Sequence, residues 1–121
     1  MRILITGSRD WDKPSVIMDA LVMETSKVDN FSERITVVHG GAAGADIIAE
    51  RLAEVLRCDT EAWLADWDKY GKSAGFVRNS KMVNLGADIC LAFIKNESRG
   101  ATMCADLAEK AGIPVKRFII D

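Results

Sequence analysis

The chain has 121 residues, of which 49% are hydrophobic and 28% are charged. That length suits one domain with a core of its own, and the apolar fraction excludes an intrinsically disordered chain. With 16 Lys and Arg against 18 Asp and Glu, the net charge of −2 argues against a protein that binds nucleic acid mainly by neutralising phosphates.

Cysteine and histidine content bears on metal sites and on cellular location. The three cysteines are odd in number and have no Cys-x-x-Cys spacing, which predicts reduced thiols. A single histidine makes a structural zinc site improbable. The apolar runs are too short to span a membrane, and residues 1–5 do not read as a signal peptide. We therefore expect a cytoplasmic protein with no membrane partner, no metal and no cofactor.

Short apolar runs alternate along the chain with segments of helical period, which is typical of a parallel α/β sheet. A strand at residues 3–5 is followed by a helix that begins near Pro14. Further strands are expected at 35–38, 58–63, 89–94 and 115–120, and further helices at 45–56, 76–85 and 101–111. We expect 64–74 to be irregular and 89–94, the most apolar strand, to be central. The predicted fold is a single three-layer Rossmann-like domain over residues 1–121, with a doubly wound parallel sheet.

In such a fold the ligand lies beyond the carboxyl ends of the strands. The loops to consider are therefore 6–13, 39–44, 64–75 and 95–100, all of which are polar or rich in glycine. The second loop begins the segment HGGAAGAD at 39–46 and carries the sharpest signal. Its glycines allow close backbone approach, and N–H groups at a helix start attract phosphate. Close packing in a tight turn is the alternative. The candidate ligand residues here are His39, Gly40, Gly41, Gly44 and Asp46.

His39 has two interpretations. It could act as the general base of a catalytic triad with Ser8 and Asp46. A histidine at a strand end more often orients a loop or hydrogen-bonds a ligand.

The first loop offers a glycine, a hydroxyl and a guanidinium, in Gly7, Ser8 and Arg9. An arginine fork suits phosphate or carboxylate, and Trp11 could cover a base. Alternatively, a neighbouring aspartate pairs with Arg9 and caps the helix.

The third loop carries Trp63, Trp67 and Tyr70, which could form a lid, stack on a base or make a dimer contact. Its GKS segment at 71–73 lacks the first glycine of a P-loop, so we exclude a Walker A site. Arg78 and Asn79 follow near the start of a helix and are candidate ligand residues, with a solvated helix face as the alternative.

Three segments together resemble the YspA-type branch of the SLOG superfamily, which also includes DprA and the LOG phosphoribohydrolases. They are ITGSRDW at 5–11, VHGGAAGAD at 38–46 and AGFVRNSKM at 74–82. The segments 87–93 and 112–115 are similar too, so the resemblance covers nearly the whole chain.

The resemblance implies a domain that binds a nucleotide or nucleotide-derived ligand, ADP-ribose-like or a ribosyl phosphate, as a sensor or sequestering module. It also implies an alternative, a LOG-type phosphoribohydrolase that cleaves an N-glycosidic bond with Arg78 as its catalytic arginine. The Gly-Thr turn of those enzymes falls at Gly100, with Thr102 shifted by one position. Their acid falls at Cys104, and a thiol cannot replace a carboxylate there; Asp106 is the nearest substitute.

DprA-like binding of single-stranded DNA is the third reading, and the net charge does not favour it. We expect a homo-oligomer with a small-molecule ligand. The sequence does not distinguish a bacterial from a phage protein.

Overall fold

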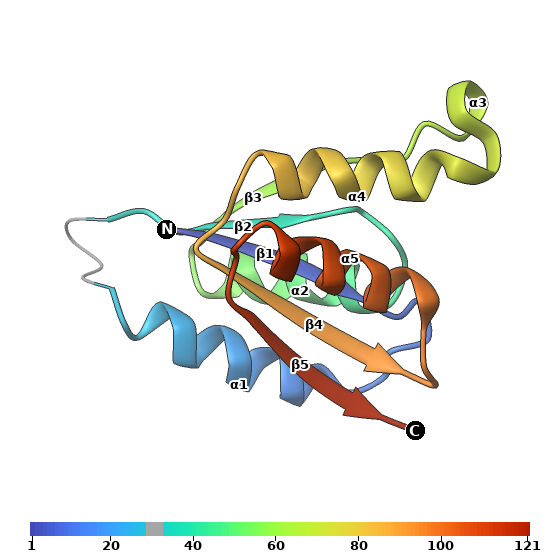
Figure 1. The fold of residues 1–121 in the computed structure, drawn as a ribbon. Helices are drawn as coiled ribbons and strands as arrows, with labels where there is room; N and C mark the ends of the chain where they lie inside the picture. Colours follow the sequence, from blue (N-terminus) through green and yellow to red (C-terminus); the bar gives the residue numbers. More distant parts are fainter. Residues whose placement is uncertain (29–32) are drawn as a thin grey trace.

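The structure is a computed structural model that describes residues 1–28 and 33–121. Strands and helices alternate along the chain (Figure 1). The strands are β1 (Arg2–Gly7), β2 (Thr36–His39), β3 (Asp59–Ala62), β4 (Ile89–Lys95) and β5 (Val115–Ile120). The helices are α1 (Pro14–Thr25), α2 (Ala45–Val55), α3 (Trp67–Tyr70), α4 (Ala74–Asn84) and α5 (Arg99–Lys110), with a 3-10 turn η1 at Gly71–Ser73.

All five strands are parallel, in the order β3-β2-β1-β4-β5. This confirms the predicted Rossmann-like sheet. The side chains of β4 are buried from Ile89 to Ile94, as its apolar sequence indicates, but β1 and not β4 is the middle strand. The chain returns to the far side of β1 when it enters β4, so the strand order reverses between these two neighbours. Both are interior strands, and apolarity alone does not distinguish them.

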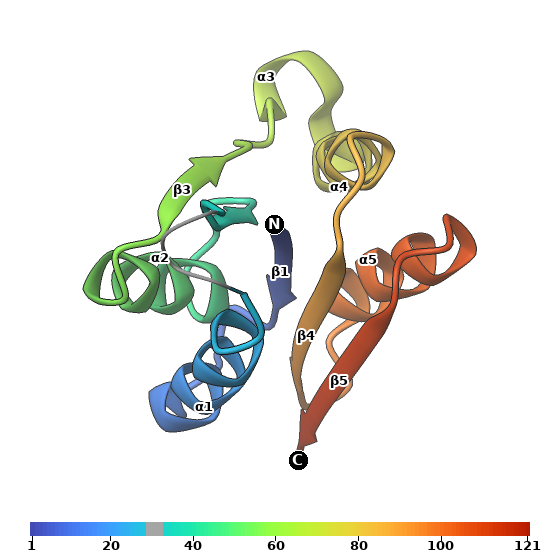
Figure 2. The same ribbon diagram turned by 90° about the vertical axis from the view of Figure 1, so that its left-hand side faces the viewer.

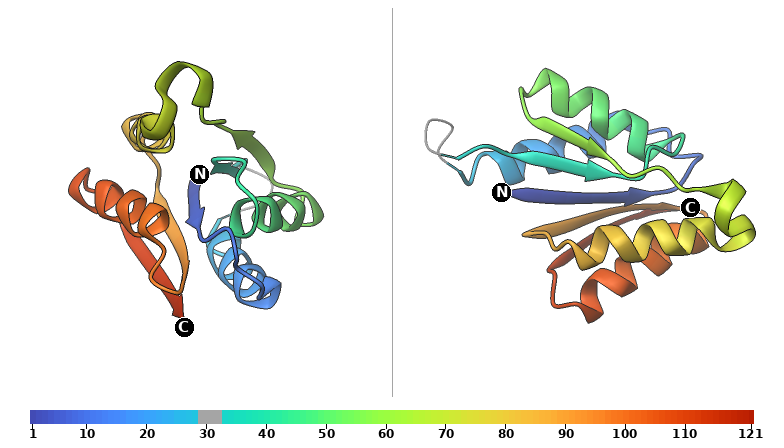
Figure 3. Two further views of the ribbon diagram at one scale, coloured as in Figure 1. Left: turned by 90° about the vertical axis from the view of Figure 1, so that its right-hand side faces the viewer. Right: turned by 90° about the horizontal axis from the view of Figure 1, so that it is seen from above.

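Helices cover both faces of the sheet. Figure 2 and both views of Figure 3 show α1 and α2 on one face and α4 and α5 on the other. α1 contacts α2, α4 contacts α5, and the short α3 extends past the carboxyl edge of the sheet, next to α4 (Figure 1). Each strand from β1 to β4 ends at the carboxyl edge of the sheet, and the helix that follows it in the chain begins at the same edge.

Side chains of β1 alternate between the two halves of the core. Ile3 and Ile5 pack on the face of α1 and α2, and Leu4 packs on the face of α4 and α5. Helix α2 presents a fully buried row of alanines, Ala45, Ala49 and Ala53. Because these side chains are small, α2 lies close to the sheet.

Residues 64–74, expected to be irregular, contain α3, η1 and the first residue of α4. The Asp66 side chain caps α3 by accepting a hydrogen bond from the backbone N–H of Lys69 at 3.1 Å. The predicted stops of the last two helices are confirmed: Gly86 and Gly112 follow α4 and α5 with φ of +82° and +85°.

Replacing Gly7 by alanine tests the close packing of β1 on α2. A Cβ at Gly7 would lie 2.3 Å from Cβ of Ala45 and 2.9 Å from the carbonyl oxygen of Phe93. We expect Gly7→Ala to lower the free energy of unfolding by about 1–3 kcal/mol, measured by urea denaturation. Gly100→Ala is the control, because no atom lies within 4 Å of its added Cβ. Equal stability of the two variants would contradict this packing.

Candidate functional site

A cavity of about 530 Å³ lies at the carboxyl edge of the sheet, next to the reversal between β1 and β4. Each of the four loops that follow β1 to β4 contributes to its wall. The residues that line it are Ile5, Thr6, Gly7, Arg9, Asp10, Ala42, Asp46, Trp67, Lys72, Gly75, Phe76, Arg78, Asn79, Met82, Ser98, Gly100, Ala101 and Met103.

The loop between β2 and α2 is held together by its own hydrogen bonds. Oδ2 of Asp46 accepts from the backbone N–H of Gly40 at 3.1 Å and of Ala42 at 3.3 Å. Nδ1 of the fully buried His39 accepts from the N–H of Gly41 at 3.0 Å. Three successive N–H groups of the predicted phosphate loop are therefore engaged inside the loop. Of its residues, Ala42 and Asp46 line the cavity.

Close packing accounts for two glycines of this loop. A Cβ at Gly44, whose φ is +79°, would lie 2.4 Å from the carbonyl oxygens of Ser8 and Arg9. A Cβ at Gly40 would lie 2.3 Å from Nη1 of Arg78. The glycines let the β2–α2 loop contact the β1–α1 loop and helix α4.

Asp46 carries the most perturbed carboxyl group of the cavity. Its side chain is buried at the start of α2, and its Oδ1 has no hydrogen-bond partner among the described residues. Burial raises the pKa of Asp46, opposed in part by the hydrogen bond from Ala42 and by the positive charge of Arg78.

Arg78 and Asn79 lie at the cavity and not on a solvated helix face. Nη1 of Arg78 donates to the carbonyl oxygen of Gly40 at 2.6 Å, and Nε donates to Oδ1 of Asn79 at 2.7 Å. The guanidinium thus ties α4 to the β2–α2 loop and forms part of the cavity wall.

Two other predicted residues have structural partners. The Ser8 hydroxyl accepts from the N–H of Lys95 at 2.7 Å and donates to its carbonyl oxygen at 3.2 Å, which joins the ends of β1 and β4. The Thr102 hydroxyl donates to the carbonyl oxygen of Ser98 at 2.7 Å and lines a separate groove between α5 and β5. Neither residue lines the cavity, whereas Gly7 and Gly100 do.

Trp11 is placed differently from its expected role over a base. It is buried against Phe93, with ring centroids 5.4 Å apart, and its indole N–H donates to the carbonyl oxygen of Lys13. The alternative, a pairing of Arg9 with Asp10 or Asp12, is also absent among the described residues. Asp12 pairs with Lys95 at 3.1 Å, and Asp10 accepts a hydrogen bond from the side chain of Asn96 at 3.3 Å. Arg9 instead lies 5.9 Å from the ring centroid of Trp67.

The rim includes Trp67, which the sequence singled out as an aromatic residue that could stack on a base, and two residues that it did not single out, Phe76 and Lys72. Of the three aromatic residues of the third loop, Trp67 lines this cavity, together with Phe76, and both are half-exposed. Lys72 adds a cation from η1. Their position in the sequence could have predicted this placement, because these residues follow β3 and therefore lie at the carboxyl edge of the sheet.

The start of α5 faces the cavity with Ser98, Gly100 and Ala101. Ser98 is the N-cap residue, but its side chain makes no capping hydrogen bond. The first N–H groups of a helix lack intrahelical partners and carry partial positive charge. This end of α5 can therefore receive an anion.

The position at which the resemblance expects an acid lies outside the cavity lining. Cys104 is fully buried in the core beside Leu4 and Val38, and burial raises the pKa of its thiol to about 11. Asp106 does not replace the acid either, since it pairs with Arg117 at 2.9 Å in the groove between α5 and β5.

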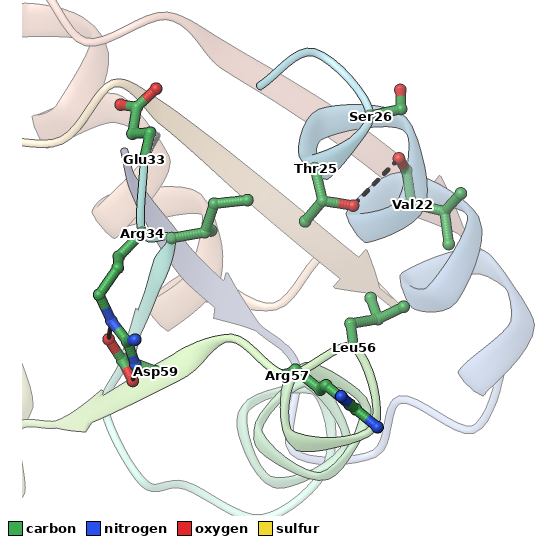
Figure 4. Close-up of a pocket in the computed structure, with 9 residues that line it drawn as sticks. Val22, Thr25, Ser26, Glu33, Arg34, Leu56, Arg57 and Asp59 are labelled. Carbon is green, nitrogen blue, oxygen red and sulfur yellow. Dashed lines mark hydrogen bonds and ion pairs between the residues drawn. The ribbon is translucent and has the colours of Figure 1, made fainter. Parts of the chain in front are cut away.

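A second cavity, of about 430 Å³, lies at the opposite edge of the sheet (Figure 4). Its wall includes the end of α1, Leu56 and the ion pair of Arg34 with Asp59. Glu33 and Arg34 directly follow residues 29–32, which lie outside the described ranges. None of the predicted ligand residues lines this cavity.

Thiol labelling at pH 8 tests the placement of Cys104. We expect Ellman's reagent to modify the half-buried Cys58 first, and Cys90 and Cys104 to react only after unfolding in urea. Peptide mapping by mass spectrometry identifies the labelled sites. Rapid labelling of Cys104 in the folded protein would contradict its burial.

Comparison with known proteins identifies the family of the chain. Residues 1–70 match the model of the YspA, cpYpsA-related SLOG family. The chain is 46% identical to the Gene 61 protein of Mycobacterium phage D29, over 97% of this chain and 95% of that protein. No solved structure matches the chain.

Helices in the described part of the chain are all too short or too polar to cross a membrane. Family membership suggests a nucleotide-related ligand or a LOG-like activity in general terms. Because the family model matches more than half of its length, the chain belongs to the YspA, cpYpsA-related SLOG family.

Proposed function

We propose that the protein binds a nucleotide-derived ligand, of the class of ADP-ribose or a ribosyl phosphate, as a sensor or sequestering module. One observation carries the proposal. The N-terminus of α5, without a side-chain cap, opens onto a cavity that Arg9 and Lys72 also line. A cavity with four sources of positive potential, the start of α5 and three basic side chains that include Arg78, and with apolar residues in its lining suits a ligand with a phosphate and a less polar remainder.

The phosphate is assigned to the start of α5. Gly100 has no atom within 4 Å of an added Cβ, so the backbone there is open to close approach. The loop after β2 is the weaker candidate, because the N–H groups of Gly40, Gly41 and Ala42 already donate to side chains. A phosphate at that loop would have to displace the Asp46 carboxylate.

The base is assigned to the rim. Trp67 and Phe76 present exposed aromatic surface beside the cavity, and Arg9 lies near the Trp67 ring. Stacking of a base on an aromatic side chain contributes about 1–3 kcal/mol and tolerates any base. The rim therefore supplies affinity with little choice among bases.

A LOG-type phosphoribohydrolase is the second candidate. The observation that favours it is the presence of a guanidinium, Arg78, and a buried carboxyl, Asp46, in one cavity. Cleavage would add water across the N-glycosidic bond and release the base and a ribose phosphate. Release of those products distinguishes hydrolysis from binding alone.

A thermal-shift screen tests the proposal with AMP, ADP, NAD, ADP-ribose, cyclic ADP-ribose and ribose 5-phosphate, followed by chromatography of each mixture. Ligand at one hundred times its Kd adds about 2.7 kcal/mol of stability. We expect a rise in Tm with at least one of them, with the ligand recovered intact. Released base or ribose phosphate would favour the hydrolase.

Two variants locate the binding site. Arg9→Ala and Lys72→Ala each remove a cation from the cavity wall and are expected to raise the Kd of the ligand roughly tenfold. Lys110→Ala, which removes a cation at the far end of α5, is the matched control and should retain the affinity. If no ligand shifts the Tm, the proposal fails. Single-stranded DNA, with its steep salt dependence, is then the next ligand to test.

A further inference from the structure

Strand β5 forms one edge of the sheet, and no strand of the described residues pairs with its outer side (Figure 2). On its inner side the carbonyl oxygen of Ile120 accepts from the N–H of Asn96 on the β4 side at 3.1 Å. Along a parallel ladder such bonds recur at every second residue, and the N–H and C=O groups of the residues between them point the other way. The backbone groups of Arg117 and Ile119 therefore point outward from the edge.

Apolar side chains flank this edge on both faces of the sheet. Ile119 is 62% exposed and lines the groove of about 640 Å³ between β5 and α5, together with Ile94 and Met103. Phe118 and Ile120 point to the other face, where both are half-buried against the core under α1 and α2. Phe118 also lines a groove of about 220 Å³ between β5 and α1. The edge thus offers apolar surface above and below its backbone.

The two cations of β5 are held by the chain itself. Charged side chains on an edge strand commonly prevent pairing with another strand. Here Nζ of Lys116 pairs with the buried Glu24 of α1 at 2.8 Å, and Nη2 of Arg117 pairs with Asp106 of α5 at 2.9 Å. Because each cation reaches a helix of its own chain, neither projects freely across the edge.

The opposite edge of the sheet is built differently. Strand β3 has four residues, with the sequence DTEA, and none of them is buried. Strand β5 has six residues, VKRFII, of which four are apolar. A short, acidic strand is typical of a protected edge, whereas a longer apolar strand is typical of one that pairs.

We infer that β5 pairs antiparallel with β5 of a second copy of the chain, about a two-fold axis at Ile119, so that the two sheets become one continuous sheet. The inference goes beyond the proposed function and does not depend on a ligand. An isologous contact brings the same surface of both copies together, and a two-fold axis between antiparallel strands makes one residue face itself.

Charge complementarity selects the position of the axis. With the axis at Ile119, this exposed side chain faces its equivalent, Arg117 lies opposite Asp121 of the second copy, and Phe118 lies opposite Ile120 of the second copy. Opposite charges and apolar pairs across strands are favourable, and like charges are not. An axis at Arg117 would oppose two guanidinium groups, and an axis at Phe118 would place Arg117 opposite an isoleucine.

Sedimentation equilibrium of the wild-type protein without added nucleotide tests the inference. A paired strand edge is a small interface, so we expect a Kd in the micromolar range. The weight-average mass should rise from that of one chain towards twice that value between about 1 and 500 µM. The mass of a single chain over this whole range would overturn the inference.

A pair of variants then locates the interface. Ile119→Lys places two like charges opposite each other on the axis and should raise the dimer Kd by roughly tenfold or more. Val55→Lys is the matched control, because Val55 is 69% exposed at the end of α2, on the far side of the sheet. It should keep the wild-type Kd. A wild-type Kd for Ile119→Lys would overturn pairing at β5, whichever surface holds the dimer together.

Disulfide formation tests the register. In a Cys58→Ser background, Ile119→Cys puts two thiols on residues whose Cα atoms lie about 5.5 Å apart in this pairing, a separation that a disulfide spans. We expect a covalent dimer on mild oxidation, seen by non-reducing electrophoresis, and none from Val55→Cys in the same background. Equal cross-linking of the two variants would overturn the axis at Ile119. The thermal-shift screen with nucleotides is independent of these results, so either proposal can fail alone.

Discussion

The carboxylate of Asp46 holds the loop between β2 and α2 in place at the carboxyl edge of the sheet. It binds the N–H groups of Gly40 and Ala42, and the carbonyl oxygen of Gly40 in turn receives the guanidinium of Arg78. Through these contacts a loop after β2, the first turn of α2 and helix α4 hold one another in place. Arg78 and Asp46 consequently belong to one hydrogen-bonded part of the cavity wall.

We therefore propose that an anion binds at the start of α5 and not at the most glycine-rich loop. The glycines after β2 serve contacts between loops, as shown by the carbonyl oxygens that crowd Gly44. The start of α5, by contrast, has neither a capping side chain nor crowding at Gly100. In this chain a buried thiol, Cys104, occupies the inner face of α5 where the LOG pattern has an acid.

Much of the fold could be predicted from the sequence because its signals are local. Apolar runs predict β1 and β4, Pro14 marks the start of α1, and Gly86 and Gly112 mark the ends of two helices. Helix α3 escaped prediction because four residues are too few for a helical period, and its stability comes from a cap by Asp66.

The candidate site was predictable in location but not in detail. Parallel strands bring their following loops to one edge, so all four loops could be placed at the cavity. Whether the N–H groups of the glycine loop are free depends on where the Asp46 side chain folds back, which residue spacing does not determine. The burial of Trp11 and the placement of Lys72 likewise depend on how the loops pack against β4 and α4.

The most direct measurement is a ¹H–¹⁵N NMR titration of the labelled protein with AMP. Phosphate binding at α5 predicts the largest amide shifts at Gly100 and Ala101, whose backbone faces the cavity. The amides of Gly41 and Ala42, already hydrogen-bonded within their loop, should move little. Large shifts at Gly41 and Ala42 with an unchanged α5 would contradict the account and return the phosphate to the glycine loop.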